Sequence, residues 1–309
     1  MSTAANRRNP LAVANDGWNR FWFAPTDPAT LSAIRLFAGA MLFYTHLVWT
    51  LDLEAFFGPN GWLPLELMDQ AHAGRPFAWT YFVWIDAPGL LWTIHIVALV
   101  IFFMLTIGLF SRIVAPLAFI AAVAYAHRIS PGASFGLDKV NCLLALYLML
   151  GPCGARYSLD RLRARRHGDE EVAPSSAANV AIRLIQIHMC VLYLFSGVSK
   201  LQGVTWWDGS AFWWGVAISE YQTLDMTWLA HTPWLFAAIT YGTLLWETFY
   251  CVLIWNRYTR VLCLVIALFV HGGIALAMGM ITFGLAMLIG NLAFISPRTV
   301  RRVFERHKG

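Results

Sequence analysis

Charged residues are scarce in this chain, and their scarcity narrows the class of protein. Asp, Glu, Lys and Arg make up 13% of its 309 residues, whereas a typical globular domain contains about 25%. This composition argues against a water-soluble fold. It also excludes a disordered chain, because disorder requires low hydrophobicity together with high charge.

Motifs for metal binding and for nucleotide or nucleophile chemistry are missing as well. The cysteines form no C-x-x-C pair and show no Cys/His spacing of a zinc site. There is no Rossmann fingerprint, P-loop or H-E-x-x-H motif, and the glycines of GASFG are interpreted as helix-end residues rather than a nucleophile elbow. We therefore expect no metal, and we expect the cysteines to pack as small apolar residues. They are Cys142, Cys153, Cys190, Cys251 and Cys263.

A secretory signal peptide is not evident either. Residues 1–27 lack an apolar core and a small-residue cleavage site. We therefore expect the first hydrophobic helix to be retained in the membrane.

Apolar residues, by contrast, are abundant. They form 59% of the chain, 15 residues are Trp, and the mean hydropathy is +0.58. A membrane helix needs about 20 apolar residues, and the sequence offers several such runs. We predict an all-α, polytopic membrane bundle of about eight transmembrane helices. The predicted spans are 30–51, 88–110, 112–129, 137–152, 178–200, 232–255, 258–279 and 282–296.

Basic residues are distributed unequally between the two sides of this arrangement. With the N-terminus inside, the inner segments hold 16 basic residues, and the outer segments and helix ends hold four. The positive-inside rule then predicts that both chain ends are cytoplasmic. Three regions follow: an interfacial or cytoplasmic segment 1–29, a membrane domain 30–296 and a basic cytoplasmic tail 297–309. Topology also accounts for the net charge of +5, so we expect no nucleic-acid partner.

Two long outer loops are rich in Trp, Phe and Gly. They are residues 52–87 and 201–231, and the second contains Trp206, Trp207 and Asp208. One interpretation is an aromatic belt with interfacial helices. The other is a lid over an outward-facing pocket, because long loops are often functional.

Ionisable residues inside membrane spans are costly and often mark functional sites. Counting about 1.5 Å per residue puts Arg35 and Glu247 at similar depth in the inner half, where they can pair. A second group maps to the outer half. A lone histidine is usually a satisfied core residue, but several ionisable groups at one depth favour a functional site. The outer group comprises His46, His95, Asp138, Lys200 and His271.

Lys200 is the most informative of these residues. It ends the fifth predicted span in the run VLYLFSGVSKLQGVTWWDG. One interpretation is a lysine that reaches the outer headgroups along its aliphatic stem. The other is a desolvated lysine under an aromatic lid, whose neutral amine is available as a base.

Six segments in order resemble a known family, over roughly residues 27–303. The chain is similar to the horizontally transferred transmembrane (HTTM) family and to the membrane half of vitamin K-dependent gamma-glutamyl carboxylase. The carboxylase's Asn-Asn-His run has no counterpart, because Cys142, Leu143, Leu144 and Ala145 stand at that place. The segments are DPATLSAIRLFAGAML, GLDKVNCLLALYL, GPCGARYSLDRL, YLFSGVSKL, LLWETF and FVHGGIALAMGMITFGLAML.

The resemblance implies base chemistry at the outer face of a bacterial inner membrane. Lys200 matches the carboxylase's catalytic lysine, with Glu247 in the place of an aspartate and His271 in the place of a histidine. Reduced vitamin K or menaquinol is the implied cofactor, and membrane lipid and a peptide or protein substrate are the implied partners. Residues expected to line the cofactor site or its entrance are Asp138, Trp206, Trp207, Asp208 and His95.

Two other functions stay open at this point. Some members of the family act in the export or maturation of peptides, so the chain can instead be a non-enzymatic membrane subunit that binds a partner protein or peptide. A transporter is favoured least, because the sequence shows no inverted repeat and no paired broken helices.

Overall fold

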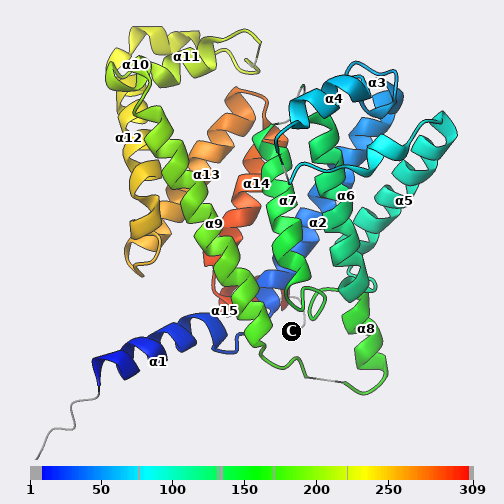
Figure 1. Ribbon diagram of the computed structural model, residues 1–309. Helices are drawn as coiled ribbons and strands as arrows, with labels where there is room; N and C mark the ends of the chain where they lie inside the picture. The colour runs from blue at the N-terminus through cyan, green and yellow to red at the C-terminus, as the bar shows by residue number, and fades with distance from the viewer. Residues whose placement is uncertain are drawn as a thin grey trace, which may run out of the picture.

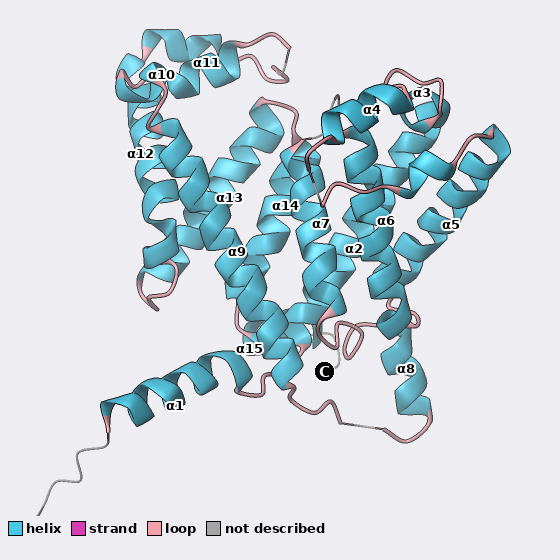
Figure 2. Ribbon diagram, viewed as in Figure 1, coloured by secondary structure: helices cyan, strands magenta, loops and turns pink. Residues whose placement is uncertain are grey.

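A computed structural model shows a helical bundle (Figures 1 and 2). It describes residues 9–75, 77–130, 132, 135–169, 171–220 and 222–305. Within these ranges the only β-type pairing is an isolated bridge between Thr26 and Ser175, and no strand forms. The predicted all-α class is confirmed.

Each of the eight predicted spans is a helix whose bounds lie within a few residues of the prediction. Apolar runs fix these helices because only an internally hydrogen-bonded backbone is stable in lipid. In chain order they are α2 (Ala29–Trp49), α5 (Pro88–Ile107), α6 (Ser111–Ile129), α7 (Gly136–Met149), α9 (Ser176–Lys200), α12 (Pro233–Leu253), α13 (Thr259–Ala277) and α14 (Ile281–Asn291).

The predicted number of eight membrane spans is not confirmed by the lengths and composition of the described helices. Among the described residues, six helical segments are long and apolar enough to cross a membrane, and α7 and α14 are not among the six. A seventh candidate combines Ile281–Phe294 with α15 (Pro297–Glu305), which is bent away from it by 115°. The two short helices have 14 and 11 residues, against the roughly 20 that a span needs.

Short helices lie at both ends of the bundle (Figure 1). One end carries α1 (Pro10–Phe23), α8 (Leu159–Arg166) and α15, and we call it the basic end because α8 and α15 are rich in arginine. The opposite end carries the two predicted outer loops, which fold into α3 (Leu53–Phe57), α4 (Leu65–His72), α10 (Val204–Trp207) and α11 (Ala211–Ala217). The described residues also form short 3-10 helices between the α-helices: η1 (Thr50–Asp52), η2 (Tyr81–Trp84), η3 (Thr227–His231) and η4 (Leu292–Phe294).

The long helices pack mainly in pairs. The closest pairs are α2 with α5, α6 with α7, α9 with α12, and α13 with α14. Helix α14 also contacts α2, α7 and α9, and so connects the two halves of the bundle (Figure 1). Large apolar side chains on the outside of α12 and α13 stay exposed, among them Val252, Phe269 and Leu276. Such a surface fits lipid chains, and the protein is an integral membrane protein.

Arg35 is buried near the basic end. The prediction that Arg35 pairs with Glu247 is wrong. Its guanidinium donates to the carbonyls of Leu105 at 2.8 Å, Thr106 at 2.7 Å and Tyr157 at 2.5 Å. Two of these carbonyls belong to the last turn of α5, where helix carbonyls lack intrahelical donors. Arg35 is therefore a buried cap for α5, and its polar partners are backbone groups rather than a carboxylate.

The turn after α5 depends on Gly108. This residue adopts a left-handed backbone conformation with φ of +68°, and its amide closes the helix onto Leu105. A Cβ at this position would lie 2.5 Å from Nη1 of Arg35. Glycine therefore permits both the turn and the close approach of the Arg35 guanidinium.

Candidate functional site

Lys200 occupies the last turn of α9 and is held by two oxygen atoms. Its Nζ donates to Ser196 Oγ at 2.6 Å and to Glu247 Oε2 at 2.5 Å. Ser196 lies four residues earlier, on the same face of α9, and Glu247 comes from α12. Among the described residues no third acceptor lies within hydrogen-bond distance of Nζ, so one N–H remains available.

The close approach of α9 and α12 makes this pair possible. A Cβ at Gly197 would lie 2.6 Å from Thr248 Oγ1 and 2.7 Å from the Thr248 amide nitrogen. Both distances are below normal contact, so the two backbones meet where only a hydrogen fits. Gly197 lies one turn before Lys200, and Thr248 follows Glu247. This glycine contact therefore brings the lysine and the carboxylate together.

The segment after α9 folds back over Lys200. The amide of Gly203 donates to the Lys200 carbonyl at 3.0 Å, and α10 then places the Trp206 ring centroid 5.2 Å from Nζ. This is the geometry of a cation–π contact. The Lys200 side chain is 21% exposed and the Glu247 side chain 9%. The amine is thus neither sealed in the core nor free in solvent.

Helices α10 and α11 are fixed against α12. Tyr241 donates its hydroxyl to the Trp207 carbonyl at 2.7 Å, and Thr240 accepts the Phe212 amide at 3.0 Å. The outer part of α12 therefore extends beyond the end of α9 and supports the segment that covers Lys200. The indole of Trp207 donates to the Leu201 carbonyl at 2.7 Å and stabilises the turn.

His271 belongs to a buried polar network beside this pair. Its Nε2 lies 2.7 Å from the Tyr193 hydroxyl, which accepts from Asn291 Nδ2 at 2.9 Å. Asn291 Oδ1 in turn accepts from Tyr250 at 2.6 Å. The network joins α9, α12, α13 and α14, and two of these helices, α9 and α12, also carry Lys200 and Glu247.

Two buried N–H groups in this cluster lack a partner. We assign the single proton of the Tyr193 hydroxyl to the hydrogen bond with His271 Nε2, which puts the imidazole proton on Nδ1. Neither His271 Nδ1 nor Trp246 Nε1 has a hydrogen-bond partner among the described residues. The two rings lie 6.3 Å apart between centroids. Buried unpaired donors are costly, and they fit a ligand that brings an acceptor oxygen.

The remaining predicted site residues lie apart from these contacts. Asp138 accepts the Phe135 amide at 2.9 Å and caps α7. Asp208 is exposed and accepts from the Ser210 hydroxyl and amide, and these hydrogen bonds hold the pKa of Asp208 below its ordinary value. Trp207 is largely exposed next to Asp208. Among the described residues no group of three His, Cys, Asp or Glu side chains is arranged to hold a metal.

The predicted outer group divides into two clusters. His95 is buried in the other half of the bundle, with Nε2 at 2.9 Å from Thr50 Oγ1 and Nδ1 at 2.7 Å from the Tyr125 hydroxyl. The His46 ring meets the Tyr125 ring edge to face, with 4.7 Å between ring centroids. Depth along a helix does not specify rotation around it, so residues at similar depth face different neighbours.

Sequence reasoning did not identify four residues of the Lys200 site. The first, Ser196, was detectable, because a position four residues before a helical lysine shares its face. The other three lie in apolar runs with no pattern that links them across helices. They are Tyr193, Trp246 and Asn291.

A comparison with known protein families agrees with the helical membrane fold described above. Neither a curated protein nor a solved structure matches the chain. The HTTM domain matches residues 23–298, which is nearly the whole chain. The chain therefore belongs to the HTTM domain family.

Proposed function

We propose that this protein is a membrane enzyme in which Lys200 acts as a base toward the hydroxyl of a lipid-soluble quinol. One observation carries the proposal: Nζ of Lys200 is held between Ser196, Glu247 and the Trp206 ring, and its side chain stays partly exposed. A base must lie within hydrogen-bond reach of the proton that it takes. The partly exposed amine offers that reach, and its partners fix its position.

Glu247 gives Lys200 a route to the neutral amine. Moving one proton from Nζ to Oε2 converts a charged pair into a neutral amine and a neutral acid. The amine can then accept a proton from a bound hydroxyl, and the ammonium that results is stabilised by Ser196 and by the Trp206 ring.

The residues around Lys200 fit a quinol such as reduced vitamin K or menaquinol. His271 Nδ1 and Trp246 Nε1 are unpaired donors for a ring oxygen among the described residues, and Trp206 offers an aromatic surface for a flat ring. A bound quinol would supply two of the four electrons that reduce oxygen, and its ring double bond would supply the other two on epoxidation. The exposed apolar surface of the bundle gives the isoprenoid tail a path from the lipid.

The proposed orientation places the Lys200 site on the outer face of a bacterial inner membrane. Helix α10, which follows Lys200 at the end of α9, lies at the end of the bundle opposite α1, α8 and α15 (Figure 1). The basic end is then cytoplasmic, in agreement with the positive-inside rule.

The test is a product assay in membranes. Membranes that contain the wild-type protein are incubated with reduced vitamin K or menaquinol and oxygen, and the epoxide is measured by mass spectrometry. Quinol and oxygen give epoxide and water, so the product reports quinol chemistry whatever the final acceptor is. Wild type should form epoxide, and Lys200→Ala and Lys200→Arg should not, because a guanidinium does not deprotonate.

The matched control is Lys139→Ala, since Lys139 is an exposed lysine on α7 outside the site. Size-exclusion profiles in detergent establish that each variant is folded. Epoxide formation by folded Lys200→Arg would contradict the assignment. If the folded wild type forms no epoxide with either quinol, the proposal is wrong, and a non-enzymatic role in partner binding becomes the better explanation.

A further inference from the structure

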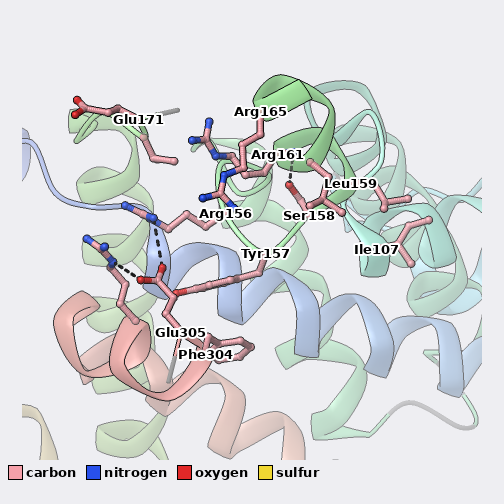
Figure 3. Close-up of a pocket in the computed structure, with 13 residues that line it drawn as sticks. Ile107, Arg156, Tyr157, Ser158, Leu159, Arg161, Arg165, Glu171, Phe304 and Glu305 are labelled. Atoms are coloured by element: carbon pink, nitrogen blue, oxygen red, sulfur yellow. Dashed lines mark hydrogen bonds and ion pairs between the residues drawn. The ribbon is translucent and has the colours of Figure 1, made fainter. Parts of the chain in front are cut away.

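A basic pocket lies at the end of the bundle opposite Lys200. Its volume is about 880 Å³, and it is formed by the segment before α8, by α8 itself and by α15 (Figure 3). Four arginines line it, together with two carboxylates, Glu171 and Glu305. The arginines are Arg156, Arg161, Arg165 and Arg301.

Protein carboxylates neutralise part of this charge. Arg156 pairs with Asp27 at 2.7 Å and with Glu305 at 3.6 Å, and Arg301 pairs with Glu305 at 3.2 Å. On the other side, Arg161 pairs with Asp169 at 3.4 Å. No ion pair of Arg165 is present among the described residues. Figure 3 shows Arg156, Arg161 and Arg165 gathered on one side of the pocket, so Arg165 adds positive charge beside two arginines that already have carboxylate partners.

The backbone holds this charge in place without a ligand. Tyr157 adopts a left-handed conformation with φ of +51°, and its carbonyl accepts from the buried Arg35 at 2.5 Å. Ser158 Oγ accepts the Arg161 amide at 2.9 Å and caps α8. Because the segment and the helix start are fixed, the arginine side chains project from a rigid support. Such preorganisation lowers the cost of binding an anion.

Apolar side chains form the other part of the pocket. Phe304 stacks on Tyr157 with centroids 4.5 Å apart, and Leu159 and Leu162 stay exposed beside the arginines. Ile107, the last residue of the membrane-spanning α5, also lines the pocket. The pocket thus begins where a membrane span ends, and it is basic on one side and apolar on the other.

We propose that this pocket binds the phosphate of an anionic phospholipid. Arginine forks match phosphate oxygens, and the apolar part fits the glycerol backbone and the first methylenes of the acyl chains. A free phosphate ion would use the arginines but not the apolar residues. The location at the end of α5 and the apolar lining therefore favour the lipid as the source of the phosphate.

The test compares lipids and arginine variants in purified full-length protein. Thermal unfolding in detergent is followed with added phosphatidylglycerol, phosphatidylcholine or inorganic phosphate. Phosphatidylglycerol should raise the Tm of wild type in a saturable manner, and phosphatidylcholine should not. Arg165→Gln should weaken the apparent affinity about fivefold, because each basic residue near anionic lipid contributes roughly 1 kcal/mol. The Arg161→Gln/Arg165→Gln double variant should weaken the affinity further.

Arg163→Gln is the matched control, since it removes the same charge from the same helix. Arg163 instead lies over the Phe110 ring at 5.0 Å and does not line the pocket. Equal weakening by Arg163→Gln, or equal stabilisation by the two lipids, would overturn the proposal. Stabilisation by inorganic phosphate as large as that by phosphatidylglycerol would identify free phosphate as the ligand and overturn the lipid assignment.

Discussion

Lys200 Nζ lies 2.5 Å from Glu247 Oε2, and this pair joins the end of α9 to the interior of α12. The two helices are offset along their axes, since Lys200 is the last residue of α9 whereas Glu247 lies past the middle of α12, and the earlier Thr240 of α12 contacts Phe212 of α11. The offset explains why a depth count along straight spans put Glu247 with Arg35. It also makes the pair depend on the contact between Gly197 and Thr248.

The first prediction concerns that contact. Gly197→Ala should destabilise the protein by about 1–3 kcal/mol, the usual cost of overpacking, although alanine favours helices. The variant should also lose epoxide formation, because separation of the helices moves Glu247 from Lys200. Gly242→Ala is the control, since nothing lies within 4 Å of a Cβ there. Thermal unfolding of both variants decides the outcome, and equal stabilities would contradict the role of Gly197.

A second prediction concerns the ion pair as a unit. Glu247→Gln should cost about 1–3 kcal/mol of stability, less than the roughly 3–5 kcal/mol of a fully buried pair, because part of the Lys200 side chain reaches solvent. Lys200→Met should cost a similar amount. The double variant should be more stable than the sum predicts, since it leaves no unpaired charge. Additive effects in this double-mutant cycle would show that the two groups do not interact.

Arg35 supports a third prediction. Arg35→Lys should destabilise the protein, because an ammonium cannot replace the planar guanidinium that reaches three carbonyls. We expect a loss of about 1–3 kcal/mol, the usual cost of leaving a buried polar group without a hydrogen bond. The control is Arg112→Lys, at an exposed arginine near the start of α6. A lowered Tm for Arg35→Lys alone is the expected result. An unchanged Tm would mean that the cap of α5 contributes little.

The fourth prediction tests the orientation of the chain. In a variant without the five native cysteines, Lys139→Cys should react with a membrane-impermeant maleimide on intact cells. Arg298→Cys, at the basic end on α15, should react only after the membrane is opened. The positive-inside rule gives this expectation. The reverse labelling pattern would place the Lys200 site on the cytoplasmic side.

The positions of the helices were predictable because hydropathy is a property of consecutive residues. The run that ends at Lys200 and the run that begins near Pro233 each specify a helix without reference to the other. The short lengths of α7 and α14 were also visible in the sequence as short apolar runs. The family assignment followed from motifs in order, and the match to the HTTM domain confirms it.

The sequence by itself determined an all-helical membrane protein, the bounds of its helices, its family and Lys200 as a candidate base. Only the tertiary structure decided that Glu247 faces Lys200, that Trp206 rather than Trp207 lies over the amine, and that Arg35 caps a helix instead. The physical reason is that pairing between helices depends on axial offset and rotation. These are set by packing, such as the contact of Gly197 with Thr248, and packing leaves no periodic signal in either helix.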